Sequence, residues 1–290
     1  MLARRVPTIL PPLTDEEAIE VTRIYSVCGQ LPRGDPLMAA RPFRAPHHAV
    51  SPQALVGGGM VPRPGEVSLA HLGVLFLDEL PEFRRDALEA LRQPIEEGRV
   101  TVARLHSAVV FPARCIVIGA MNPCPCGHRG DAGRSCLCSP AQQRRYLRRL
   151  SGPLIDRMDL HVEVPRVAGV DLTTTAPGEG SGAVRARVVR ARGIQAARGA
   201  GCGIAGPTNA SIPLPQLHER RWLSDDVRAF LRRAIDRLSL SPRAYERVIR
   251  VARTIADLDA AREVSLPHVA EALHYRTLDR DAAALGTEGG

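Results

Sequence analysis

The sequence predicts an α/β fold in which a parallel sheet and its helices are followed by a small, all-helical domain. Two short apolar runs, 73–77 and 115–121, are bounded by glycine or polar residues, as expected for buried strands of a parallel sheet. Residues beyond 182 show helical patterns and no convincing strand. At 290 residues, the chain is long enough for a large domain with a smaller companion.

The composition is that of a folded, basic protein. Hydrophobic residues make up 44% of the chain and charged residues 24%, which argues against wholesale disorder. The net charge is +8, and all 39 basic residues are arginine. This charge favours contact with a polyanion such as nucleic acid, although genome base bias also produces arginine-rich chains. Because the sequence has no apolar run that could span a membrane and no secretory signal, we expect a cytoplasmic protein without membrane contact.

The first half of the chain alternates helices, strands and one long loop. Residues 2–10 predict a helix that ends before Pro11, and Thr14 with Glu17 forms a capping box that starts a helix reaching about residue 28. The many prolines and glycines at 29–65 indicate a long functional loop with one short helix. The other expected elements are a helix at 82–97, a hairpin of 99–103 and 108–111, a helix at 140–150 and a strand at 160–164.

Composition also predicts the domain boundaries. A stretch rich in Gly, Thr, Ala and Pro marks a linker at 169–182, which separates an α/β core at 1–168 from a helical domain at 183–276. A flexible tail is expected at 277–290. Helices of the second domain are predicted at 183–198, 224–237, 241–258 and 266–274.

Two carboxylates follow the first apolar strand. Asp78 and Glu79 would lie at the carboxyl end of this strand, where ligands of open α/β sheets bind. In phosphoryl transfer, such an acid helps to hold the Mg²⁺ that bridges the phosphates, and a neighbouring acid orients or activates the attacking water. We therefore predict a Walker B pattern in which Asp78 serves the metal and Glu79 the water. Taken alone, the pair is equally compatible with a strand that ends in solvated acids.

Asn122 follows the second apolar strand and should reach the same edge of the sheet as Asp78. An amide at this position fits a sensor of the γ-phosphate of a nucleotide. The alternative is an asparagine that caps the turn before Pro123.

Four cysteines lie in a short loop at 123–139. Cys124, Cys126, Cys136 and Cys138 could supply four thiolates to one structural, tetrahedral Zn²⁺, and His128 could replace one of them. The CxC spacing is less diagnostic than the CxxC spacing of common zinc sites. A reduced loop without metal, or thiols that respond to oxidants, are therefore the alternatives.

Several longer motifs occur in one order along the chain: FRAPHH, GGG, PRPGEVSLAH, GVLFLDELPEF and MNPCPCG. Together they resemble the magnesium-chelatase-like AAA+ ATPases of the ComM/YifB group, over nearly the whole chain. The resemblance implies an AAA+ P-loop NTPase-type core with a helical lid domain. It also implies ATP and Mg²⁺ as ligands and assembly into a homo-oligomeric ring, as a hexamer.

The resemblance implies roles for several arginines. Arg157 in GPLIDRMD matches the arginine that reaches a neighbouring subunit's nucleotide, and Arg243 in LSPRAYERVIRVAR matches the second sensor of the lid. Read without the resemblance, Arg157 could pair with an adjacent aspartate, and Arg243 could be one of several solvated arginines on a basic helix. The resemblance places Arg104 on the insertion before the first sensor and Arg63 on a second insertion near the central pore. Both arginines could contact DNA phosphates without reading sequence.

The family pattern places a GxxxxGK[ST] phosphate-binding loop immediately before the helix at 2–10, and the present chain contains no lysine. We therefore expect a fragment or a truncated product that binds nucleotide weakly and turns over little as written. The leading hypothesis is an ATP-dependent DNA motor of the branch-migration helicase type, acting in recombination of DNA taken up in competence. The alternatives are a magnesium chelatase subunit and a catalytically inactive, zinc-stabilised protein that binds DNA or modulates a ring.

Overall fold

Two compact units, Met1–Leu154 and Ile155–Gly290, make up the chain. The computed structural model describes residues 2–31, 34, 37–104, 107–131, 133–165, 178–203, 206–217, 222–238 and 240–276. No helix in these ranges is both long and apolar enough to cross a bilayer.

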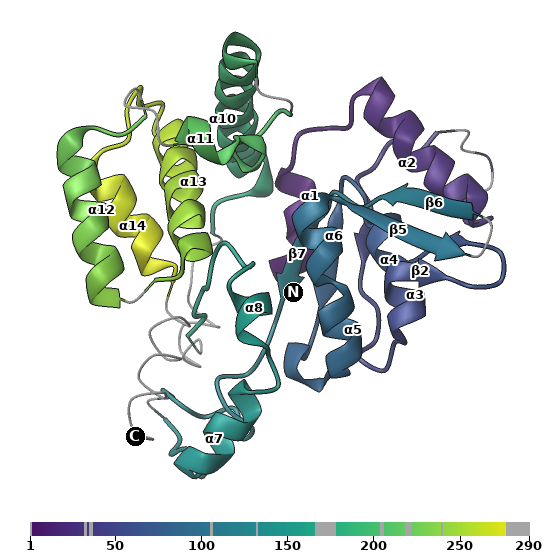
Figure 1. The fold of residues 1–290 in the computed structure, drawn as a ribbon, viewed down its shortest axis with the longest axis horizontal. Helices are drawn as coiled ribbons and strands as arrows, with labels where there is room; N and C mark the ends of the chain where they lie inside the picture. Colours follow the sequence, from purple (N-terminus) through teal and green to yellow (C-terminus); the bar gives the residue numbers. More distant parts are fainter. Residues whose placement is uncertain are drawn as a thin grey trace. The chain divides into compact units, whose positions relative to one another are not determined.

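The first unit combines a small parallel sheet with helices and two hairpins (Figure 1). Its helices are η1 (Leu2–Arg5), α1 (Val6–Ile9), α2 (Asp15–Val27), α3 (Pro52–Val56), α4 (Glu66–Leu69), η2 (Leu80–Glu82), α5 (Arg85–Ala90), α6 (Arg92–Glu97) and α7 (Pro140–Leu147), with α8 (Gly152–Ile155) at the boundary in the sequence. Its strands are β1 (Phe43–Arg44), β2 (Gly57–Gly58), β3 (Arg63–Pro64), β4 (Val74–Leu77), β5 (Arg99–Arg104), β6 (Ser107–Pro112) and β7 (Ile116–Gly119).

The parallel sheet has the strand order β1-β4-β7, which confirms the predicted fold class. β4 lies in the middle, and its Val74, Leu75 and Leu77 are 0% exposed. Both apolar runs seen in the sequence are therefore strands. β1 is a strand that the sequence did not predict, because two residues inside a segment rich in proline and glycine are too short to show a period.

Gly73 allows β4 to start close beside β1. A Cβ atom at this position would lie 2.0 Å from the carbonyl oxygen of Pro42, so every side chain larger than hydrogen would collide with backbone. The close approach lets Val74 N donate to Pro42 O at 2.8 Å, immediately before the paired residues of the two strands. Glycine at 73 is thus part of what sets the register of the sheet.

Helix α2 begins at the predicted capping box, in which Glu17 N donates to Thr14 Oγ1 and Thr14 N donates to Glu17 Oε2. The predicted helix at 82–97 is instead divided into α5 and α6. Its interior contains Pro94, whose ring would clash with the carbonyl of Ala90, four residues earlier, if the helix continued. Helix α5 accordingly ends at Ala90.

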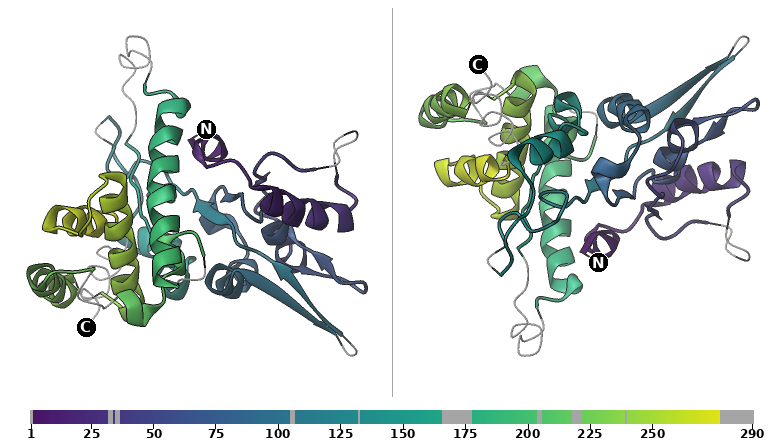
Figure 2. Two further views of the ribbon diagram at one scale, coloured as in Figure 1. Left: turned by 90° about the horizontal axis from the view of Figure 1, so that it is seen from above. Right: turned by 90° about the horizontal axis from the view of Figure 1, so that it is seen from below.

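The β5–β6 hairpin forms as predicted, with Arg99 opposite Pro112, and it projects from the body of the first unit (Figure 2). The strand predicted at 160–164 is wrong. Leu160, Val162 and Val164 are 49%, 64% and 70% exposed, and no strand pairs with this segment within the described residues. Alternating side chains alone cannot form a strand without a partner for the backbone, and His161 N donates instead to Tyr275 O.

In its described residues, the second unit is helical, as predicted, with an isolated β-bridge between Leu223 and Val264. Its helices are α10 (Ser181–Cys202), η3 (Asn209–Ser211), α11 (Leu214–Leu217), α12 (Asp225–Leu238), α13 (Pro242–Leu258) and α14 (Leu266–His274). α13 packs against α10, α11 and α14, and its buried face includes Val248, Ile249 and Ala252.

Candidate nucleotide site and cysteine cluster

A hollow of about 530 Å³ lies at the carboxyl ends of β4 and β7. Its lining includes Asp78 and Glu79, which directly follow β4, and Asn122, which comes three residues after β7. The sheet therefore brings the three residues predicted to handle Mg²⁺, water and phosphate to one edge, as parallel strands do. The complete lining is Asp78, Glu79, Glu82, Ala120, Met121, Asn122, Pro125, Gln142, Arg145, Tyr146 and Arg149.

Asp78 offers a carboxylate that could hold Mg²⁺, and Asn122 offers an amide that could donate to a phosphate. Both side chains are exposed at the hollow, and they present carboxylate and amide oxygens. Mg²⁺ in phosphate sites is commonly held by one or two carboxylates together with the phosphates and water. The residues present fit a magnesium–nucleotide complex better than a fully protein-enclosed ion.

Glu79 adopts a left-handed backbone conformation, with φ 53° and ψ 46°. Such a conformation is uncommon for a residue with a side chain, and it persists where the surroundings hold it. Here Leu80 N donates to Ala120 O at 2.8 Å, and Glu82 N donates to Glu79 O at 2.7 Å. The turn directs the chain out of β4 and leaves the Glu79 carboxylate exposed at the edge of the sheet.

His48 also lies at this site, although no role could be predicted for it from the sequence. Its Nδ1 lies 3.3 Å from Glu79 Oε2. The His48 ring is held between its neighbour His47, at a centroid distance of 4.1 Å, and the edge of Phe83, at 6.4 Å. His48 follows β1, the parallel neighbour of β4, so recognition of β1 would have placed this histidine at the same sheet edge.

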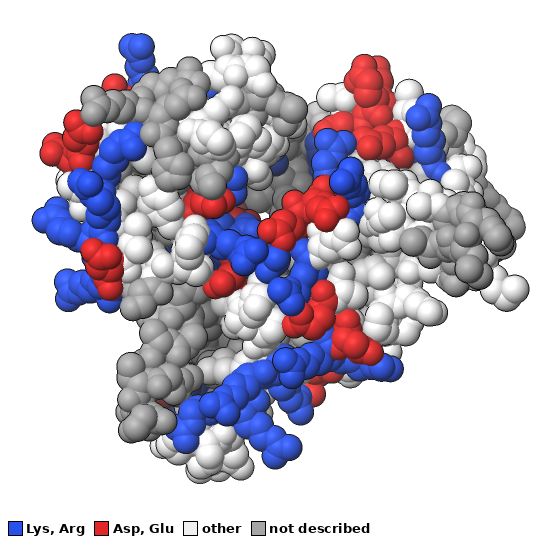
Figure 3. Space-filling view, in the orientation of Figure 1, with Lys and Arg blue, Asp and Glu red and all other residues white. Residues whose placement is uncertain are grey.

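Helix α7 and the residues directly after it supply a cationic wall. Arg145, Tyr146 and Arg149 line the hollow, and a band of arginine side chains covers the region of α7 in Figure 3. Arg149 donates to Glu82 Oε1 at 2.7 Å and to Pro81 O at 3.3 Å. Burial raises the pKa of Tyr146, whereas a hydrogen bond with the backbone of Asn122 acts in the opposite direction. Carboxylates and arginines thus face one cavity. The carboxylates could bind the metal ion of a metal–phosphate complex, and the arginines could bind its phosphates.

The remaining predicted residues lie elsewhere. Arg157 belongs to the second unit and is 6% exposed, and Arg243 is exposed in the first turn of α13. Arg63 is exposed in β3. Arg104 ends β5, but its side chain lies outside the described residues.

Arg253 is not one of the solvated arginines expected on the basic helix α13. It is 2% exposed, and its Nη2 lies 3.0 Å from the fully buried carboxylate of Asp257. Arg198 also binds Asp257, and Asn209 Nδ2 donates to the same carboxylate at 2.8 Å. The buried group is a structural network that ties α10 and η3 to α13.

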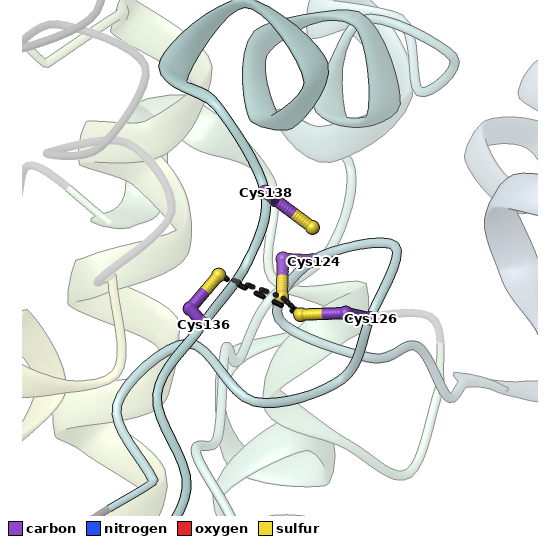
Figure 4. Close-up of side chains that lie close together, drawn as sticks. All are labelled: Cys124, Cys126, Cys136 and Cys138. Carbon is purple, nitrogen blue, oxygen red and sulfur yellow. Dashed lines mark hydrogen bonds between the residues drawn. The ribbon is translucent and has the colours of Figure 1, made fainter.

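The four clustered cysteines converge at the loop that follows β7 (Figure 4). All four sulfur atoms lie within 4.8 Å of one another. The Sγ of Cys124 lies 3.4 Å from Cys126 and 3.6 Å from Cys136, and the Cys126–Cys136 distance is 3.6 Å. These separations exceed the roughly 2.05 Å of a disulfide bond and lie near the roughly 3.8 Å edge of a zinc–thiolate tetrahedron with Zn–S bonds of about 2.3 Å.

The loop also supplies backbone donors to the sulfur atoms. Hydrogen bonds from the backbone of His128 and Leu137 lower the pKa of the Cys126 thiol to about 6. The ring of His128, which the sequence suggested as a substitute ligand, lies instead 3.5 Å from Asp131. In the described part of the chain, the four thiols form the cluster whose ligand atoms lie close enough together to hold a metal ion.

Two family models match the chain. Magnesium chelatase, subunit ChlI, matches residues 1–172, and the C-terminal model of the same subunit matches residues 178–276. The chain belongs to the magnesium chelatase subunit ChlI family. Within this family it is a relative of the ComM/YifB group, as the motifs of the sequence predicted.

The curated relatives are similar over nearly all of the chain. Competence protein ComM of Haemophilus influenzae is 47% identical over 281 residues, which is 97% of this chain and 53% of the relative. The protein YifB of Escherichia coli is 44% identical over 282 residues, and that of Salmonella typhimurium is 44% identical over 285, each covering 97% of this chain and 54% of the relative. The chain thus spans about half the length of these relatives.

Proposed function

We propose that this ChlI-family chain forms part of a magnesium-dependent ATPase. The observation that carries the proposal is the convergence of Asp78, Glu79 and Asn122 on one hollow at the sheet edge. Asp78 would hold the metal of a magnesium–ATP complex. When bound, this ion would neutralise charge on the phosphates. Asn122 would donate its amide to the γ-phosphate.

Glu79 would orient and activate the attacking water. The left-handed turn places its carboxylate beyond the end of β4, next to the proposed metal ligand Asp78. His48 lies against one carboxylate oxygen, which leaves the other oxygen for the water. His48 is therefore a positioning residue in this proposal.

Arg157 and Arg243 would complete the site in an assembled ring. Arg243 is exposed at the beginning of α13, where a second sensor could reach a phosphate. Arg157 is 6% exposed in the chain as described, so a role toward a neighbouring subunit's nucleotide requires its side chain to turn outward during assembly. The proposed ring is a hexamer of identical subunits.

DNA is the proposed polyanionic partner. Between β2 and β3, Met60 is 98% exposed and Val61 71%, and Arg63 is exposed beside them. Such a protruding hairpin with an arginine can contact the backbone of a strand without reading its sequence. ComM is named a competence protein, and we propose that the present chain likewise acts on DNA, as a motor of the branch-migration type in the cytoplasm.

The four clustered thiols are proposed to bind one structural Zn²⁺. Four thiolates leave no open coordination position, so the ion would take no part in hydrolysis. Elemental analysis of the chain purified under reducing conditions should find one zinc per chain, and finding none would remove this assignment.

The ATPase proposal is tested on two proteins, the present chain and a version extended upstream with a GxxxxGK[ST] loop. In the extended version, Glu79→Gln should lower kcat by about 100-fold or more, while magnesium–ATP is still bound, because the amide cannot accept the proton of water. Hydrolysis of ATP with and without branched DNA is the measurement. Parental turnover in this variant would refute the role of Glu79.

The family model supports a second candidate, a subunit that uses ATP to drive magnesium insertion into a porphyrin. The same extended protein discriminates the two. Stimulation of its ATPase by branched DNA supports the DNA motor, whereas metal insertion into a porphyrin in the presence of the other chelatase subunits supports the second candidate. Binding of DNA by both versions without any hydrolysis would indicate the inactive, zinc-stabilised alternative.

A further inference from the structure

The cysteine loop connects two walls of the proposed nucleotide site. It begins at Pro123, directly after Asn122, and it ends at Ser139, the N-cap residue of α7. Pro125, within the loop, is itself part of the lining of the hollow. Both the amide at the end of β7 and the arginine-bearing helix are therefore attached to this loop.

Helix α7 has little of its own to fix its position. It is 8 residues long and has no buried residue. Isolated helices shorter than about 12–15 residues are marginal in water, and most helices in proteins are stabilised by a buried apolar face. The position of α7 therefore depends on contacts at its ends and on half-buried side chains such as Tyr146 and Gln143.

Those contacts lead back to the cysteine loop. Gln143 of α7 donates to Cys138 O at 3.2 Å, and its Nε2 lies 3.7 Å from Cys136 Sγ. The Ser139 side chain accepts from Gln142 N, and Gln142 Oε1 accepts from Ser139 N at 2.8 Å. At the other end of the helix, Arg149 binds Glu82.

The loop in turn lacks an apolar core. Within the described part of 123–139, the buried side chain is that of Cys124, and the backbone forms no helix or strand. Ordering such a segment costs conformational entropy that its own apolar contacts cannot offset. Four converging thiols are the feature that could offset it, because metal binding contributes directly to folding free energy.

We propose that zinc in the cysteine loop acts as a clip that positions Asn122 and α7, so that metal occupancy decides whether the proposed nucleotide site is formed. The proposal rests on the zinc site and on the nucleotide function given above. The zinc would thus control the formation of the nucleotide site without taking part in ATP hydrolysis.

Hydrogen–deuterium exchange of the full chain tests this inference without requiring hydrolysis. The chain is compared with one equivalent of zinc and after removal of zinc by a chelator, both under reducing conditions. Removal should accelerate exchange in α7 by at least about 10-fold, and exchange at 120–122 should also rise, whereas α13 in the second unit serves as the internal reference and should stay protected.

Two variants and one control separate zinc binding from the positioning of α7. Cys138→Ser should lose zinc and show fast exchange in α7, whereas Cys28→Ser, outside the cluster, should keep one zinc and slow exchange. Gln143→Ala leaves all four thiols in place, so it should still bind one zinc while α7 exchanges several-fold faster.

Three results would be decisive against parts of the scheme. Absence of zinc binding refutes the site, and zinc binding that leaves exchange of α7 unchanged refutes the clip. If zinc protects α7 but the extended, zinc-loaded chain does not bind magnesium–ATP, the clip stands and the proposed nucleotide function fails.

Discussion

Glu79 combines a demanding backbone conformation with a proposed catalytic role. A residue with a Cβ in the left-handed region costs about 1 kcal/mol or more relative to the right-handed region, whereas glycine avoids this cost. The sequence allowed us to predict the carboxylate but not this conformation, because nothing in the letters DE indicates φ above zero. Strain at this residue is consistent with selection for the position of the carboxylate rather than for stability.

Replacement of Glu79 should therefore separate stability from activity. We expect Glu79→Gly to be more stable to urea than Glu79→Ala by about 1 kcal/mol, because only alanine retains the strain. Neither variant of the extended protein should hydrolyse ATP. Equal urea midpoints for the two variants would show that the left-handed backbone of residue 79 is not strained by a Cβ atom.

His48 offers a second test at the scale of one residue. In the extended protein, His48→Ala should lower kcat by about 10-fold with little change in KM, because the water-activating carboxylate loses its neighbour. His48→Gln, whose amide can still donate to Glu79, should recover part of the loss. His274→Ala is the matched control, since His274 is an exposed histidine at the end of α14 in the second unit. An equal loss in both alanine variants would contradict the positioning role.

At the scale of elements, β4 and β7 could be predicted because buried parallel strands are continuous apolar runs. β1 could not, and with it His48 was missed, because a two-residue strand is defined by its neighbour and by the space at Gly73. The strand predicted at 160–164 was wrong because its alternating pattern has no partner strand in the described chain. Whether a segment becomes a strand depends on a neighbouring strand that is distant in sequence. This explains both the missed strand β1 and the wrong prediction at 160–164.

Helix α13 shows the same dependence on tertiary contacts. Its sequence predicts a basic, solvated face, but Arg253 turns inward to Asp257 and donates to Ala261 O and Arg262 O. The carboxylate of Asp257 is the counter-ion that makes burial of this arginine tolerable.

Removal of this counter-ion should be costly. Asp257→Ala leaves the guanidinium groups of Arg253 and Arg198 beside an apolar side chain, and we expect a loss of about 3 kcal/mol in unfolding free energy. Asp236→Ala, on the exposed face of α12, should change stability by less than about 0.5 kcal/mol. Thermal and urea unfolding are the measurements. A loss in Asp257→Ala no larger than in the control would show that the network contributes nothing net.

At the scale of the whole molecule, the net charge of +8 and the exposed β2–β3 hairpin lead us to expect that the proposed binding of DNA depends on salt. Binding of the full chain to duplex and branched DNA should weaken linearly on a logarithmic salt scale. Arg63→Ala should reduce the slope by about one, equally for DNA of different sequences. Arg233→Ala, on the exposed face of α12, is the control of equal charge. An unchanged slope in Arg63→Ala would place the DNA contact elsewhere.

β7 is the last strand of its sheet, and within the described residues nothing pairs with its outer side. On that side, its backbone amides and carbonyls pair with no strand of the described residues, and Ile116 is 38% exposed. A bare edge of this kind accepts any compatible strand, whether from residues outside the described ranges or from another copy of the chain. We therefore expect the purified chain to self-associate along the outer side of β7. Because Asn122 follows β7 by three residues, self-association should also change access to the proposed nucleotide site.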